Sequence, residues 1–265
     1  MSQLTSELKS CYAFVERNFN LVKRYLGWEI VFLVYNIVNA LTIGFIGVTQ
    51  GKEKVLYLVV GAMLWGFLSI LFHEVSESVS WERWEGTIEY TFMAPVHRFT
   101  HLGGMCVYAI IYGIIRTVVL LLAVALFFNL SLQNANFAAA LVILVISSLS
   151  FIGLGLMAAV LPLMSPEKGS QATHIFQAVL LLISGVYYEI NVLPVWIRPL
   201  SVVSPATYTL RTMRAALLEG SSLGQMWNTL LFLLIIGLLL IPLGLFIFHL
   251  AEIYAKKKGK LKRSG

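Results

Sequence analysis

Six long apolar runs limit what this chain can fold into. They lie at 28–48, 55–76, 102–128, 137–163, 172–188 and 226–250, and each is close to the roughly 20 residues that a helix needs to cross the hydrocarbon of a bilayer. Hydrophobic residues make up 58% of the chain and charged residues 12%, which is not typical of a water-soluble domain. We therefore expect an all-α integral membrane protein with six transmembrane helices in a single domain over 1–265.

The basic residues predict how these spans are oriented. If the N-terminus lies inside, thirteen of the 19 lysines and arginines fall in cytoplasmic segments and five in outer segments. Six of the thirteen form a basic cytoplasmic tail within 251–265, namely Lys256, Lys257, Lys258, Lys260, Lys262 and Arg263. Such a tail binds anionic lipid, so we expect lipid and not nucleic acid as its partner. The expected location is the inner (cytoplasmic) membrane of the cell, with both termini cytoplasmic.

Two segments outside the spans have recognisable patterns. Residues 1–26 keep their apolar side chains on one helical face, which predicts an amphipathic helix on the membrane surface. Residues 189–225 are long and only half apolar, which predicts an outer re-entrant region built from short helices. Within it, Ser204 is expected to cap a helix that begins at Pro205 and stops at Gly220.

The segment 77–98 holds four of the chain's thirteen acidic residues between two apolar runs. At helical spacing, Trp81, Trp84, Ile88 and Phe92 form one stripe, and Glu82, Glu85 and Glu89 form the next. This pattern predicts one amphipathic helix that ends at Ala94, with its aromatic side buried and its acids facing water. Such a helix is either a simple anchor in the headgroup zone or a docking surface for another protein.

Few residues suggest catalysis or ligand binding. Arg116 lies near the middle of the third expected span and needs a partner, a cavity or a path to the headgroups, whereas Glu29 is expected at the interface. Gly103, Gly104, Gly113, Gly153 and Gly155 are expected where helices pack closely. His73-Glu74 does not extend to a zinc-protease motif, and the chain has no phosphate-binding loop. We therefore expect no enzymatic activity and no cofactor in this chain.

Two stretches carry a resemblance to a known family. The run WERWEGTIEYTFMAPVHR at 81–98 resembles the E-G-T-[LI]-E…P-V-x-R signature in the first cytoplasmic loop of ABC-2 type permeases. The run SGVYYEINVLPVWIRPLSVVSPATYTLRTMR at 184–214 is similar to the family's stretch before the last span. Ser204 departs from it, because many relatives have asparagine there.

The resemblance implies roles for particular residues. Residues 77–98 would be the coupling helix that contacts a separate ATPase subunit, with a secondary contact at 165–171. The implied contact residues are Trp81, Glu82, Trp84, Glu85, Gly86, Glu89 and Glu167. The pathway or gate candidates are Arg116, Tyr187, Tyr188, Pro205, Tyr208 and Arg214, of which Pro205, Tyr208 and Arg214 match the family's outer re-entrant stretch.

The resemblance also implies an assembly. Two such chains, identical or closely related, would form a pathway with two copies of an ABC ATPase, and ATP and Mg would bind to that partner. Because the spans contain little charge, we expect export of a hydrophobic or amphiphilic drug or lipid, with a polysaccharide or glycolipid as the alternative. An ATPase-independent channel or an ion-coupled carrier is the alternative of another class; such a carrier needs ionisable groups near midplane, and Arg116 is the only candidate.

Overall fold

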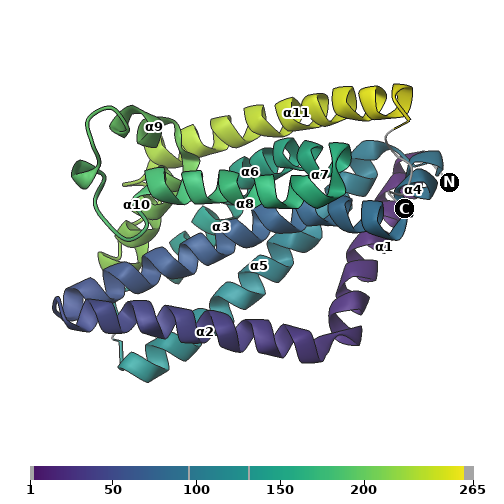
Figure 1. The fold of residues 1–265 in the computed structure, drawn as a ribbon. Coiled ribbons are helices and arrows are strands. Elements are labelled where there is room, and N and C mark those ends of the chain that lie inside the picture. The colour runs from purple at the N-terminus through teal and green to yellow at the C-terminus, as the bar shows by residue number, and fades with distance from the viewer. Residues whose placement is uncertain (1–2, 95, 131, 260–265) are drawn as a thin grey trace.

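The computed structural model describes residues 3–94, 96–130 and 132–259, and within them every regular element is a helix. The all-α membrane architecture is therefore confirmed. Long helices lie lengthwise in one bundle (Figure 1). In chain order the elements are α1 (Gln3–Arg24), α2 (Leu26–Val48), α3 (Lys52–Glu85), α4 (Ile88–Met93), α5 (Arg98–Phe128), α6 (Phe137–Ala158), α7 (Val160–Met164), α8 (Pro166–Ser184), the 3₁₀ turn η1 (Ile190–Val192), α9 (Arg198–Val203), α10 (Pro205–Leu218) and α11 (Trp227–Lys257).

Five helices in the described part of the chain are long and apolar enough to cross a membrane. They are Leu26–Val48, Lys54–Glu85, Phe99–Phe128, Phe137–Met164 and Trp227–Lys257. The other expected span, 172–188, coincides with α8, which packs along α3 but has a polar first half. Its outer limit is wrong, because Gly185 takes a left-handed conformation (φ 69°) and ends the helix at Ser184.

Helix α3 is the centre of the bundle. It packs against α2, α5, α6, α8 and α10. Several of its apolar side chains, among them Leu64, Phe67, Leu68 and Leu71, are completely buried. By contrast, α2, α5 and α11 keep many large apolar side chains exposed on the outside of the bundle, as helices do when their outer faces meet lipid.

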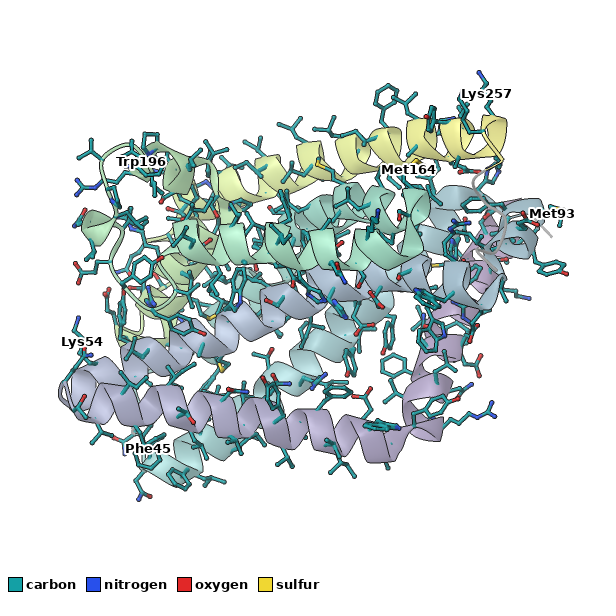
Figure 2. All side chains as sticks on the ribbon, viewed as in Figure 1. Phe45, Lys54, Met93, Met164, Trp196 and Lys257 are labelled. Atoms are coloured by element: carbon teal, nitrogen blue, oxygen red, sulfur yellow. The ribbon has the colours of Figure 1, made fainter. Side chains whose placement is uncertain are left out.

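The two ends of the bundle differ. The start of α1, the short α4 and the end of α11 gather at one end, and α9 lies at the opposite end (Figure 1). Helix α1 runs steeply across the first end and packs against α5 (Figure 1). Lys257 at the end of α11 lies near Met93 of α4, far from Trp196 before α9 (Figure 2).

Glycines set the spacing of several helix pairs. A Cβ at Gly153 of α6 would lie 2.6 Å from the carbonyl carbon of Leu240 in α11, so only glycine allows this approach. The expected packing role also holds for Gly104, Gly113 and Gly155, each of which faces a neighbouring helix at short range. It is wrong for Gly103, where a Cβ would meet nothing within 4 Å.

Residues 189–225, the expected outer region, contain short helices, as their pattern predicts. Helix α10 begins with Pro205 in its first turn and ends at Leu218, before Gly220 with its positive φ of 68°. The expected side-chain cap is absent, because the Ser204 hydroxyl does not bond to α10. It lies 3.0 Å from the hydroxyl of Ser184, so it links the start of α10 to the end of α8.

Candidate functional site

The segment 81–93, which we call the elbow, is where the structure departs most from the sequence prediction. Helix α3 continues through Trp81 and Trp84, and Gly86 stops it in a left-handed conformation (φ 74°). The backbone N–H of Thr87 then donates to the carbonyl of Glu82 (2.9 Å), which closes the helix end, and α4 follows. The prediction of one continuous helix over 81–92 is therefore wrong, although its end at Ala94 is confirmed.

The break also changes which side chains are buried. Ile88 packs into an apolar cluster with Val79 and Leu102 and is fully buried. Trp81 and Trp84 are 60% and 56% exposed within the chain, so the bundle itself does not bury the aromatic stripe at these two positions. The elbow presents to its surroundings two indoles, the exposed carboxylates Glu85 and Glu89, and the side chains of Tyr90 and Met93.

Glu82 is buried, contrary to the prediction that it faces water. Its Oε1 lies 3.2 Å from Nε2 of His101 on α5 and 3.5 Å from a guanidinium nitrogen of Arg17 on α1. A buried carboxylate needs such partners, because its desolvation is otherwise costly. Phe14 stacks edge-on against the His101 ring at 4.8 Å. Glu82 thus joins α1, the elbow and α5, and it is not available to a partner protein.

Residues 165–171, where the secondary contact is expected, form the start of α8. Pro166 starts that helix, and Glu167 falls in its first turn. The side chain of Glu167 lies outside what the structure describes. Gly169 lies directly against the backbone of Leu161 and Pro162 in α7, so α7 and α8 pack closely here.

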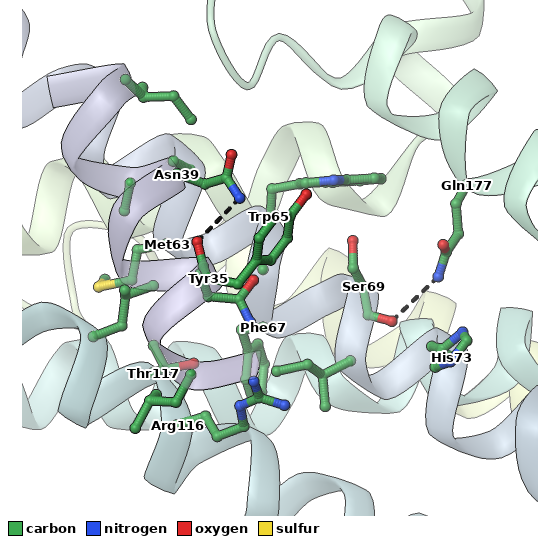
Figure 3. Close-up of a pocket in the computed structure, with 18 of the residues that line it drawn as sticks. Tyr35, Asn39, Met63, Trp65, Phe67, Ser69, His73, Arg116, Thr117 and Gln177 are labelled. Atoms are coloured by element: carbon green, nitrogen blue, oxygen red, sulfur yellow. Dashed lines mark hydrogen bonds between the residues drawn. The ribbon is translucent and has the colours of Figure 1, made fainter. Parts of the chain in front are cut away.

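Two cavities lie on one side of α3. The core cavity, about 700 Å³, is bounded by α2, α3, α5 and α8, and its wall includes Arg116 (Figure 3). Tyr187 also lines it. The vestibule, about 500 Å³, is bounded by α1, the start of α2, the C-terminal half of α3, the elbow and α5. His73 and Glu74 line both cavities, so the two meet at this point of α3.

Arg116 has the partners that its place in a span requires. Its Nη1 donates to the hydroxyl of Tyr112 (2.7 Å) and lies 4.0 Å from Oε2 of Glu29 on α2. The Tyr112 hydroxyl in turn donates to Glu29 (2.5 Å). The structure thus brings together Arg116 and Glu29, which the sequence treated separately. Tyr112 was missed, although it lies one helical turn before Arg116 and so on the same face.

A polar seam joins α3 to α8 inside the bundle. The Gln177 amide donates to the Ser69 carbonyl (3.2 Å), as Figure 3 shows, and the rings of His73 and His174 stack at 5.5 Å. Ser76 and Thr173 share a hydrogen bond of 3.1 Å, and Ser170 donates to Glu77 (3.2 Å). The sequence analysis missed this seam. The signal was the spacing of Ser170, Thr173, His174 and Gln177, which places four polar residues on one face of the helix.

The outer gate candidates fall into separate places. Arg214 of α10 donates to the carbonyls of Gly185 (3.2 Å) and Val186 (2.6 Å) and lies over the ring of Tyr57 on α3 at 3.5 Å. Burial lowers the pKa of the Arg214 guanidinium below its ordinary value, and Tyr57 and Glu189 oppose this shift. This group, Arg214 with Tyr57 and the two carbonyls, is the outer latch; it fixes the chain just before Tyr187, which lines the core cavity.

The remaining candidates do not join the outer latch. The Tyr208 hydroxyl donates to the Val202 carbonyl (2.8 Å), and its ring packs against Phe232 of α11 at 4.7 Å. Tyr188 donates back to the carbonyl of Leu182 in α8. Pro205 is buried in the first turn of α10. These three residues shape the outer helices, and Arg116 and Tyr187 are the two candidates that line the core cavity.

Comparison with known proteins gives one family. Residues 9–218 match the family model described as ABC-2 type transporter, which covers most of the chain, including the elbow, α8 and α10. A comparison with curated proteins gives no significant match.

Proposed function

Because the chain belongs to the ABC-2 type transporter family, we propose that it is the permease subunit of an exporter driven by a separate ATPase subunit. The observation that carries this proposal, beyond the family itself, is the exposed surface of the elbow. Indoles and carboxylates together at the end of a long buried helix suit a protein partner, since aromatic side chains supply most of the energy of such contacts.

The elbow is well placed to pass on a partner's movement. Its first residues, from Trp81 to Glu85, form the last turn of α3, the helix that packs against most of the bundle. ATP and Mg would bind to two ATPase subunits, and their closure would push on the elbows of two permease chains, identical or closely related. The permeases would then alternate between inward-facing and outward-facing states by rigid-body motion.

The same end of the bundle fits a cytoplasmic side. It contains the start of α1 and the end of α11 with Lys256, Lys257 and Lys258 (Figure 1). We therefore place both termini and the elbow inside, in the inner membrane of the cell, and α9 and α10 outside. A drug-sized or lipid-like amphiphile is the favoured substrate, because the core cavity of about 700 Å³ is lined by both apolar and polar side chains.

The test is co-purification of the ATPase through a tag on this chain. The chain is expressed with candidate ATPase subunits from its own genome, as wild type and as the double variant Glu85→Lys/Glu89→Lys. Glu82 is left intact because its reversal would damage the fold. We expect the wild type to retain an ATPase and the double variant to lose it, while the control Glu16→Lys, on an exposed part of α1, retains it.

Two results would overturn this proposal. One is full ATP-dependent transport by the double variant, which would remove the elbow as the coupling surface. The other is transport by the purified chain without any ATPase, which would favour a channel or an ion-coupled carrier.

A further inference from the structure

The charge of the vestibule is opposite in sign to the net charge of the chain. The chain carries a net charge of +6, yet the charged residues that line the vestibule are one arginine and five glutamates. They are Arg17, Glu29, Glu74, Glu77, Glu82 and Glu85. An acidic cavity with low-dielectric walls concentrates cations and repels anions. The vestibule therefore favours cationic molecules that approach from the elbow end of the bundle.

Most of these carboxylates already have partners. Glu82 is paired with Arg17 and His101, Glu29 is held by Tyr112 and Arg116, and Ser170 donates to Glu77. Glu85 is exposed at the elbow.

Glu74 differs from the other glutamates of the vestibule. Among the described residues it makes no hydrogen bond or ion pair, and it faces both the vestibule and the core cavity. A carboxylate without a partner between two cavities inside a membrane domain is costly, and it gains most from a cation that reaches it.

The core cavity beyond Glu74 suits the rest of such a molecule. Its wall includes the aromatic side chains of Tyr35, Trp65, Phe67 and Tyr187. Tyr35, Trp65 and Phe67 lie around the same space as Arg116 (Figure 3), whose Nη1 lies 4.0 Å from Oε2 of Glu29. Aromatic faces attract cations and cover apolar bodies. The cavity thus suits an aromatic or apolar cation. Among the described residues, Arg116 is the one arginine or lysine in its wall, and it is shared with Tyr112 and Glu29, although its Nη2 has no hydrogen-bond partner.

We propose that Glu74 binds the positive group of an amphiphilic cation, which enters through the vestibule and places its apolar body in the core cavity. This inference rests on the proposed function and narrows its substrate class. It differs from the expectation drawn from the sequence, in which the near absence of charge in the spans pointed to an amphiphile of unspecified charge.

The experiment measures binding of two probes of the same shape and opposite charge to the permease alone in nanodiscs, without ATPase or ATP. Tetraphenylphosphonium is the cation and tetraphenylborate the anion, and empty nanodiscs correct for partition into lipid. We expect saturable binding of tetraphenylphosphonium and none of tetraphenylborate. In Glu74→Gln the Kd for the cation should rise about tenfold or more, because a charge contact at this depth is lost.

Matched variants distinguish loss of the charge contact from unfolding of the protein. Glu16→Gln removes an exposed carboxylate of α1 that lines neither cavity, and it should change the Kd by less than about twofold. Glu74→Asp keeps the charge and should bind better than Glu74→Gln. Saturable binding of tetraphenylborate by the wild type, or unchanged binding of the cation by a folded Glu74→Gln, would overturn the inference.

The two proposals can fail separately. Loss of cation binding with an ATPase still bound would leave the exporter proposal intact, whereas cation binding without any ATPase partner would point to a carrier or channel.

Discussion

Nε2 of His101 lies 3.2 Å from Oε1 of Glu82, and this contact joins the start of α5 to the last turns of α3. Both side chains are buried, and Arg17 of α1 approaches the same carboxylate oxygen. Glu82 is therefore a structural residue of the elbow, although its place in the sequence suggested a docking residue.

Replacing Glu82 by glutamine should destabilise the protein. The substitution removes the negative charge opposite Arg17 and weakens the contact with His101, at an expected cost of about 2–4 kcal/mol in unfolding free energy. Urea unfolding in mixed micelles measures it, and hydrogen exchange should show α1 opening more often. Glu85→Gln, an exposed change on the same helix end, should cost less than about 0.5 kcal/mol. Equal stability of the two variants would contradict this assignment.

Gly86→Ala should weaken the elbow. Gly86 has φ 74°, where a Cβ clashes with the following carbonyl, so alanine should cost about 1 kcal/mol. Asparagine tolerates this conformation better, and Gly86→Asn should lose less stability than Gly86→Ala. The same unfolding experiment compares them, and a Gly86→Ala variant as stable as the wild type would mean that the turn does not need glycine.

Two glycine-to-alanine substitutions should have effects of opposite sign. At Gly153 the new methyl group would meet the backbone of α11 at 2.6 Å, so α6 and α11 must separate, at a cost of about 1–3 kcal/mol. At Gly103 the methyl group meets nothing within 4 Å, and the higher helix propensity of alanine should add up to about 1 kcal/mol. Thermal unfolding of both variants in one detergent tests this. A stabilised Gly153→Ala would show that the contact between α6 and α11 can repack.

Arg214→Lys should open the outer latch. Lysine cannot reproduce the forked contact with the carbonyls of Gly185 and Val186, so we expect a loss of about 1–3 kcal/mol. Hydrogen exchange of residues 185–189 should become faster. Arg211→Lys is the matched control on the same helix, because Arg211 is exposed and its replacement should leave exchange unchanged. Equal exchange in both variants would argue against the latch.

The sequence predicted the helices better than their contacts. Five of the six long apolar runs, the Pro205 start of α10 and the Gly220 stop follow from local chemistry, and the structure has them where expected. The elbow was predicted wrongly because helical periodicity was carried across Gly86, where a left-handed residue resets the direction of every later side chain.

The site residues were harder to predict because their roles depend on neighbours far away in the chain. Glu29 and Arg116 are 87 positions apart, and only the packing of α2 against α5 brings them together. Glu74 was named only to exclude a zinc motif. Its open position between two cavities depends on four or more elements at once, and no local pattern reports that.

Helix α3 passes without a break from Lys52 to Glu85, a distance of about 50 Å at 1.5 Å per residue. Near one end Tyr57 lies under Arg214, and near the other Glu82 ties the helix to α1 and α5. Between them Gly155 lets α6 lie against the backbone of α3 at Phe72. One unbroken helix therefore connects the exposed tryptophans at one end of the bundle with Arg214 at the other, so the two ends of α3 share a single rigid element.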